Sequence, residues 1–251
     1  MVQQTKIKMT IKRTSGRALN EMRKMSATVG VVPNADGSAM FAFGDTIAIA
    51  AVYGPRHLHP QHLQDPTQGI LRVNYDLLSF SVEDRKRPGP SRRSHEISKV
   101  TQWALEPAVD LKEFPNTVVD VQIYIIQADA GTRTAGINAA SLALAHAGIP
   151  MKDLICSVAL GKLDKTLVTD VDKEEEDFEE GEGATDFPIA KLGTSDQYTL
   201  VQMDGKLQPE HMKGILDLAE ESCKQIYEVQ KQALKDVVES QQSESDKGEL
   251  K

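Results

Sequence analysis

The chain has 251 residues, 40% of them hydrophobic, and a formal net charge of −8. It contains no apolar run of the roughly 18 residues that a membrane helix needs, and no apolar stretch follows its N-terminal charges, so we expect neither a membrane span nor a secretory signal. The two cysteines, Cys156 and Cys223, have neither CxxC spacing nor neighbouring histidines, which favours buried thiols in a reducing compartment. We therefore expect a cytoplasmic protein without a disulfide.

The predicted elements of the first half alternate between strands and helices. Residues 1–12 are expected to form an irregular arm, and residues 14–25 a turn followed by a short helix. Alternating apolar residues and Gly-containing turns indicate the strands, and apolar residues at helical spacing indicate the helices. Strands are predicted at residues 26–32, 38–43, 46–53, 70–75 and 118–126, and helices at residues 94–111 and 137–146.

The second half repeats the pattern of strands followed by a helix. Strands are predicted at residues 154–161, 167–171 and 198–203. A long helix from about Pro209 to Val238 has an apolar face that is typical of packing, and the polar residues 240–251 are expected to be disordered. The sequence thus predicts an α+β domain over residues 13–239, with halves of roughly 13–150 and 151–239.

Charge is segregated along the chain. Residues 170–182 contain nine acids and one lysine, so the rest of the chain is neutral. Residues 85–93 hold five cations in nine positions. A local basic patch matters more for binding a polyanion than total charge does, so the acidic balance does not exclude a nucleic-acid ligand.

Residues 127–133, Gln-Ala-Asp-Ala-Gly-Thr-Arg, lie where a predicted strand turns into a predicted helix. At such a point Gly131, Thr132 and Arg133 would offer backbone N–H groups, a hydroxyl and a guanidinium to one ligand. This combination is typical of an anion site, with phosphate as the expected anion. An ordinary helix cap is the alternative interpretation.

Arg92 and Arg93 follow a loop that Pro88 and Pro90 stiffen, and they directly precede a helix. Cations are unfavourable at a helix N-terminus, so Glu96, the acidic segment or a bound anion must compensate them. Solvated arginines are the alternative, but the stiff loop favours a pair placed to receive a phosphate.

Asp186 precedes the apolar run Phe187-Pro-Ile-Ala190, so it is expected to be partly desolvated and to serve as proton donor or metal anchor. The other acids of this region are expected to form a solvated loop.

His57, His59 and His62 lie in a polar loop without a carboxylate or cysteine partner, which favours contact with a substrate or partner over a zinc site.

An ordered series of motifs spans nearly the whole chain, from Arg13 to the end of the long helix. The series resembles the RNase PH family of phosphate-dependent exoribonucleases, and within it the catalytic RNase PH-like exosome subunits of archaeal type. The motifs are Arg13-Thr-Ser-Gly-Arg17, Asn34-Ala-Asp-Gly-Ser38, Ala50-Ala-Val-Tyr-Gly-Pro55, Arg85-Lys-Arg-Pro-Gly-Pro-Ser-Arg-Arg93, Glu96-Ile-Ser-Lys99, Leu111-Lys-Glu-Phe-Pro115, Gln127-Ala-Asp-Ala-Gly-Thr-Arg133, Ala147-Gly-Ile-Pro-Met151 and Asp186-Phe-Pro.

The resemblance implies the RNase PH fold (ribosomal protein S5 domain 2-like), with two pseudo-symmetric halves. It also implies a hexameric ring, a trimer of heterodimers with a homologous non-catalytic subunit, together with RNA-binding cap subunits. The implied activity is 3′-to-5′ phosphorolysis of RNA with inorganic phosphate as co-substrate. A non-catalytic scaffold subunit and a stand-alone tRNA-trimming phosphorylase are the alternatives.

The resemblance also implies roles for single residues. Gly131, Thr132, Arg133 and Arg93 would hold phosphate, and Asp186 with a second acid would act in catalysis and hold Mg²⁺ or Mn²⁺. The loop before Asp186 is about three residues longer than is usual in the family, so Asp177 is the first choice for that acid and Glu180 the second. Ser15 replaces a common acid, and Gln61 stands where related chains often have Arg. The residues expected to bind RNA are Arg92, Arg93, Arg72 and His59.

Overall fold

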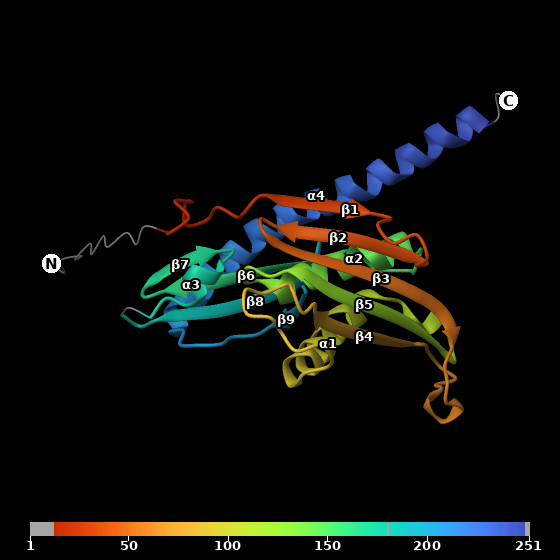
Figure 1. The fold of residues 1–251 in the computed structure, drawn as a ribbon, viewed down its shortest axis with the longest axis horizontal. Helices are drawn as coiled ribbons and strands as arrows, with labels where there is room; N and C mark the ends of the chain where they lie inside the picture. Colours follow the sequence, from red (N-terminus) through yellow and green to blue (C-terminus); the bar gives the residue numbers. More distant parts are fainter. Residues whose placement is uncertain (1–12, 180, 249–251) are drawn as a thin grey trace.

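Two β-sheets enclose a central helix in the computed structural model, which describes residues 13–179 and 181–248 (Figure 1). The first sheet has the order β1-β2-β3-β5-β4, antiparallel except between β4 and β5. The second sheet has the antiparallel order β7-β6-β8-β9. The strands are β1 (Met25–Val29), β2 (Gly37–Phe43), β3 (Thr46–His57), β4 (Ile70–Leu77), β5 (Thr117–Gln127), β6 (Ile155–Leu163), β7 (Thr166–Thr169), β8 (Ala184–Leu192) and β9 (Tyr198–Val201).

The central helix is α2 (Thr132–His146), which packs against β2 and β3 of the first sheet and β6 of the second. Its small residues make this close packing possible. A Cβ at Gly136 would lie 3.1 Å from Ile123 Cγ2, so a larger residue would push α2 away from the first sheet. Because α2 is held on both sides, its N-terminus has a fixed position between the two sheets.

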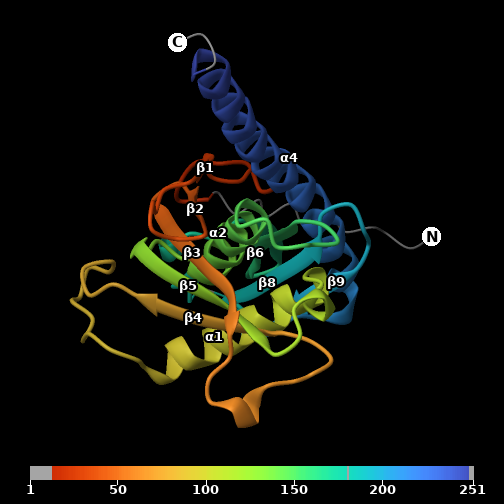
Figure 2. The ribbon, with the colours of Figure 1, turned by 90° about the vertical axis from the view of Figure 1, so that its right-hand side faces the viewer.

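The other helices pack around this centre, and both α1 (Arg92–Leu105) and α4 (Pro209–Gly248) contact α2. Helix α1 also contacts β4 and β9 (Figure 2). The short α3 (Lys173–Glu176) lies beside β8 (Figure 1). The long α4 covers β6 and β1, and its C-terminal part projects beyond the body (Figure 1). The 3₁₀ helices are Gln61–Leu63, Glu106–Ala108 and Leu111–Glu113. No described helix is long and apolar enough to cross a bilayer.

The predicted strands are all present, but two other predictions were wrong. Residues 14–24 contain no helix; this segment has turns at residues 14–15 and 19–20 and leads into β1. Residues 240–248, predicted as a disordered tail, continue α4 because no Gly or Pro interrupts the chain before Gly248. The predicted arm at residues 1–12 and residues 249–251 lie outside the described residues.

The acidic segment is not the uniformly solvated loop that we expected. Asp170 and Glu175 are each 2% exposed, and Asp172 is 9% exposed. Arg13 donates two hydrogen bonds to Glu175, at 2.6 and 2.8 Å, and Arg17 pairs with Asp172 at 3.0 Å. Buried carboxylates need such partners because an unpaired buried charge is costly. The acids thus fix the N-terminal segment against the second sheet.

Candidate active site

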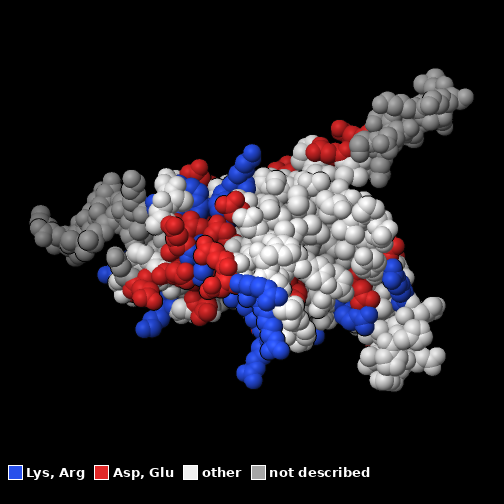
Figure 3. Space-filling view, viewed as in Figure 1, with Lys and Arg blue, Asp and Glu red and all other residues white. Residues whose placement is uncertain are grey.

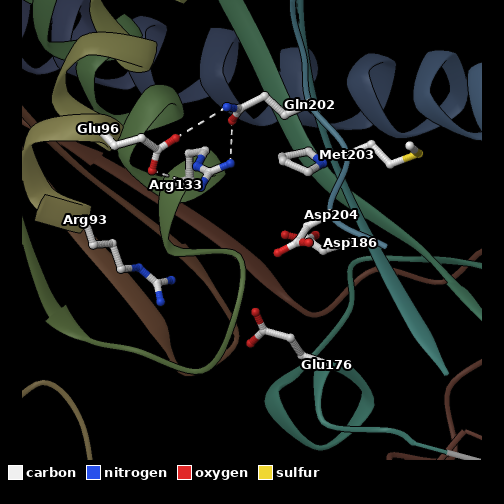
Figure 4. Close-up of a pocket in the computed structure, with 9 residues that line it drawn as sticks. Arg93, Glu96, Arg133, Glu176, Asp186, Gln202, Met203 and Asp204 are labelled. Carbon is white, nitrogen blue, oxygen red and sulfur yellow. Dashed lines mark hydrogen bonds and ion pairs between the residues drawn. The ribbon is translucent and has the colours of Figure 1, made fainter. Parts of the chain in front are cut away.

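A polar pocket of about 410 Å³ opens between the two halves, where the start of α2 faces β8 and the end of β9 (Figure 4). Arg93, Arg133 and Glu96 lie on one side of it and Asp186 and Asp204 on the other, with Glu176 at its base in this view. Side chains that are distant in sequence therefore converge here. The lining residues are Arg93, Glu96, Arg133, Glu176, Asp186, Pro188, Gln202, Met203 and Asp204.

The turn that starts α2 has the geometry of an anion cradle. Ala130 and Gly131 both adopt left-handed conformations, with φ of 51° and 62°. No described side chain caps the helix, so the first N–H groups of α2 are left for a ligand. Thr132, 7% exposed, is the first helical residue. Free N–H groups, a hydroxyl and the positive end of the helix dipole all favour an anion at this point.

Arg133 is held in place by residues from both halves. Its Nη1 donates to Gln202 Oε1, and its Nη2 lies 3.6 Å from Glu96 Oε2. Gln202 Nε2 in turn donates to Glu96 Oε1 at 3.4 Å. The Nε–H of Arg133 is buried without a hydrogen-bond partner among the described residues. A buried unpaired donor is unfavourable, so an acceptor such as a phosphate oxygen would satisfy it.

Tyr75 on β4 provides a second unpaired polar group close to the cradle. Its side chain is 1% exposed, and its hydroxyl makes no hydrogen bond of ordinary geometry with any described residue, although it lies beside Thr132. Burial raises the pKa of Tyr75 to about 12, and Thr132, Arg93 and Arg133 act in the opposite direction. The hydroxyl therefore stays protonated at neutral pH and can donate a hydrogen bond.

Asp186 is the partly desolvated acid that the sequence predicts. It lies in β8, and its backbone pairs with that of Asp204 through hydrogen bonds of 2.9 and 2.8 Å. Burial raises the pKa of Asp186 to about 6; the negative charges of Glu176 and Asp204 add to this effect, and Arg133 opposes it. A carboxyl group with such a pKa can carry a proton near neutral pH, as a general acid must.

Arg92 and Arg93 begin α1 after a capping box between Ser91 and Ser94. Both are exposed, and neither has an ion-pair partner within the part of the chain that the structure describes. Glu96, one of the three expected compensating groups, pairs with Arg133 instead. Arg93 points into the pocket (Figure 4), and Figure 3 shows basic side chains projecting next to an acidic cluster near α3. The charge of the two arginines is therefore free for an external anion.

Several residues predicted for the site lie elsewhere. The Asp177 carboxylate turns outward, 63% exposed, and pairs with Lys173 Nζ at 2.7 Å across one turn of α3; the adjacent Glu176 faces the pocket instead. Glu180 lies outside the described residues. Arg72 on β4 pairs with Asp120, with one contact at 2.8 Å, and His59 is exposed in the loop after β3. The structure therefore does not bring Asp177, Arg72 or His59 together with Asp186.

Sequence reasoning missed four pocket residues, Glu176, Gln202, Met203 and Asp204. Gln202, Met203 and Asp204 directly follow β9. Strand β9 pairs with β8, which carries Asp186. The sequence predicts the strand at residues 198–203, but the pairing of β9 with β8 could not be read from it. Glu176 was missed because a single turn of helix decides which acids face inward.

The pocket fits a divalent cation only in part. The described residues contain no group of three or more His, Cys, Asp or Glu side chains arranged to hold a metal. Mg²⁺, however, is commonly held by one or two carboxylates and completed by water and phosphate oxygens. Asp186, with Glu176 or Asp204 beside it, matches that donor set. The residues therefore fit a cation that arrives with phosphate or RNA rather than one enclosed by protein.

Comparison with known families decides the relationship. The model of domain 1 of the 3′ exoribonuclease family (RNase PH) matches residues 21–150, and that of domain 2 matches residues 153–222. This chain belongs to the 3′ exoribonuclease family. The family resemblance and the fold predicted from the motifs are thus confirmed.

Curated relatives support the same assignment. The chain is 52% identical over 225 residues to the exosome complex component Rrp41 of Thermococcus kodakarensis, covering 90% of this chain and 89% of that protein. It is 48% identical over 225 residues to Rrp41 of Nitrosopumilus maritimus, covering 90% and 91%. Both similarities span the first and second halves, so they include the whole pocket.

Solved structures share the fold. Rice (Oryza sativa) Rrp46 superposes with a TM-score of 0.78 at 24% identity, covering 89% of this chain and all of that one. A chain of the Archaeoglobus fulgidus exosome with RNA bound to the active site gives a TM-score of 0.72 at 23% identity, covering 88% and 92%. At these identities the likeness shows the architecture alone.

Proposed function

We propose that this protein is the catalytic RNase PH-like subunit of an exosome and degrades RNA from its 3′ end by phosphorolysis. The observation that carries the proposal is the pocket itself. It places an uncapped helix start and two arginines opposite a carboxyl group whose pKa is raised to about 6. The similarity to Rrp41 exosome components supports the assembly.

The proposed reaction is attack by an oxygen of inorganic phosphate on the last phosphodiester of an RNA. A new P–O bond forms, and the bond to the 3′ oxygen of the preceding nucleotide breaks, which releases a nucleoside diphosphate. The N–H groups of Gly131 and Thr132, together with Arg133 and Arg93, offset the repulsion between the two anions. In reverse, nucleoside diphosphates would extend the RNA 3′ end, because the bonds exchanged are of similar energy.

Asp186 would give its proton to the leaving 3′ oxygen. When bound, Mg²⁺ or Mn²⁺ would neutralise charge on the phosphate groups, with Asp186 and its neighbouring acids as ligands. Arg92, exposed at the start of α1, would contact the RNA backbone next to Arg93. These roles use every charged group on the arginine side of the pocket except Glu96, which holds Arg133.

The proposed assembly is a cytoplasmic hexameric ring of three heterodimers with a homologous non-catalytic subunit, on which RNA-binding cap subunits sit. A non-catalytic scaffold is the competing function, and the free Nε–H of Arg133 and the raised pKa of Asp186 are the features that disfavour it. A stand-alone tRNA-trimming phosphorylase would use the same pocket but would assemble from this chain alone.

The test is release of nucleoside diphosphates from a single-stranded RNA in phosphate buffer, by the chain alone and with a co-expressed ring partner. We expect release that requires phosphate, loss of turnover with retained RNA binding in Asp186→Ala, and a raised phosphate requirement in Arg133→Ala. Release of nucleoside monophosphates without a requirement for phosphate would contradict the proposal. So would the absence of nucleoside diphosphate release both by the chain alone and with its partner. The mass of each purified assembly distinguishes the heteromeric ring from a stand-alone enzyme.

A further inference from the structure

A buried arginine lies directly beneath the phosphate-binding turn. Arg23 lies two residues before Met25, the first residue of β1, and its side chain is 9% exposed. A Cβ placed on Gly131 would be 3.4 Å from Arg23 Nη2, so the guanidinium packs against the turn that begins α2. Arg23 is not among the residues that line the pocket of the candidate active site.

The Arg23 guanidinium joins the turn to the second sheet. Its Nη1 donates to the Asp129 carbonyl oxygen at 2.5 Å and to Asp129 Oδ2 at 3.1 Å. Its Nη2 and Nε donate to the two carboxylate oxygens of Asp170, at 2.7 and 2.9 Å. Burial lowers the pKa of Arg23, but Asp170 and Asp129 outweigh it and raise the pKa, so the group remains charged. The planar guanidinium of Arg23 thus holds the carboxylates of Asp129 and Asp170 in place.

Thr46 anchors the same turn from the first sheet. Its hydroxyl lies 2.8 Å from the Asp129 carbonyl oxygen and 2.7 Å from that of Ala130, and it accepts from the Asp129 N–H at 3.0 Å. Thr46 is fully buried at the start of β3. The turn is therefore anchored from both sides, by Arg23 and by Thr46.

We infer that Arg23, with Thr46, is a positioning residue that sets the affinity of the cradle for orthophosphate. The inference rests on the proposed function. Ala130 has a φ of 51°, a conformation that a non-glycine residue keeps only where its surroundings enforce it. Without Arg23 the turn would relax, and the N–H groups of Gly131 and Thr132 would lose their common direction.

The inference predicts a specific kinetic signature. In Arg23→Gln the KM for phosphate should rise roughly tenfold, the size expected when charged hydrogen bonds that hold an anion site are lost. The kcat at saturating phosphate should stay within about twofold, because a relaxed cradle that is filled still presents phosphate to Asp186. Arg23→Lys should give an intermediate KM, because one ammonium group cannot reach Asp129 and Asp170 together.

Arg17→Gln is the matched control. Arg17 is also a largely buried arginine, 12% exposed, and it also contacts Asp170, but it makes no contact with residues 129–131. It should lower thermal stability without changing the KM for phosphate. Thr46→Val removes the second anchor with little change of shape, so it should raise the phosphate KM even if Arg23→Gln does not fold.

The experiment measures phosphate titrations of nucleoside diphosphate release by the wild type and these variants in the active assembly, with a thermal melt of each. A raised phosphate KM in Arg23→Gln or Thr46→Val, absent in Arg17→Gln, supports the inference. An unchanged KM, or a lower kcat with the same KM, overturns it while the proposed function stands. A wild type that releases no nucleoside diphosphate would instead remove the proposed function and this inference with it.

Discussion

Arg133, at the start of α2 in the first half, donates a hydrogen bond to Gln202, which follows β9 in the second half. The contact crosses the pocket that separates the two halves. Glu96 completes the arrangement at 3.6 Å from Arg133 Nη2. The guanidinium of Arg133 is therefore oriented before any ligand binds. Catalysis of phosphoryl transfer depends mainly on positioning and on preorganised charge of this kind.

Arg133→Ala should raise the KM for phosphate by about 10–100-fold, because a charged donor to the anion is lost. Gln202→Leu should raise it by a smaller factor, because Arg133 stays but loses its orienting acceptor. Phosphate titrations of nucleoside diphosphate release measure both effects. Lys152→Ala is the control, since Lys152 donates to the Pro107 carbonyl and does not line this pocket. An equal effect of Lys152→Ala would show that the change reflects general electrostatics rather than the cradle.

Asp186→Asn should stabilise the protein at neutral pH while it removes activity. The pKa of Asp186 is about 6 in the folded protein, against an ordinary aspartate value of 3.8, so its protonated form contributes stability that is present below about 3.8 and lost as pH rises through about 6. Asn carries no charge, and we expect it to raise the free energy of unfolding at pH 7.5 by about 1–3 kcal/mol.

Thermal or denaturant unfolding of wild type and Asp186→Asn at pH 7.5 and near pH 4 checks this expectation. The difference between the two proteins should shrink at the lower pH, where Asp186 is mostly protonated. A variant that is less stable than the wild type at pH 7.5 would mean that the carboxylate is well solvated or paired in solution, and so would remove its candidacy as proton donor.

The turn from strand to helix at Gly131, Thr132 and Arg133 could be predicted from the sequence because its elements are local. Gly131, Thr132 and Arg133 are consecutive, and the transition from strand to helix that gives them meaning could be read from hydrophobic periodicity. Asp186 was recognised for a similar reason, as an acid that leads into an apolar strand. The order of strands in the two sheets could not be read from the sequence, because it depends on pairing between segments that are distant in the chain.

The acids that accompany Asp186 were harder to predict. Whether Glu176 or Asp177 faces the pocket depends on one turn of helix, and no periodic pattern marks it. Nor could the sequence show that Asp170 and Glu175 are buried, because their partners Arg13, Arg17 and Arg23 lie some 150 residues away in the chain. Long-range ion pairs leave no local signal.

The choice between Glu176 and Asp177 can be tested through the titration of Asp186. Glu176 raises the pKa of Asp186 through its negative charge, second only to burial. Glu176→Gln should therefore lower that pKa from about 6 toward its ordinary value. Asp177→Asn should leave it unchanged, because the Asp177 carboxylate pairs with Lys173 at the surface. A carboxyl-carbon NMR titration of Asp186 in the two variants decides; a shift in Asp177→Asn alone would return Asp177 to the pocket.

The free charge at the start of α1 should appear in the salt dependence of RNA binding. Arg92 has no ion-pair partner among the described residues, whereas the guanidinium of Arg72 is neutralised by Asp120 through two contacts. An arginine that contacts an RNA phosphate displaces about one counterion, so Arg92→Ala should reduce the slope of log K against log salt by about 0.7 for a single strand.

Arg72→Ala should change that slope much less, since removing Arg72 also leaves Asp120 uncompensated rather than removing a free cation. Binding of a fluorescent single-stranded RNA to the phosphate-free assembly at several salt concentrations measures both slopes. Asp186→Ala is used as the background, so that no RNA is degraded during the titration. A larger change in Arg72→Ala than in Arg92→Ala would place the RNA along β4 and β5 rather than along the start of α1, and would reverse the assignment of these two arginines.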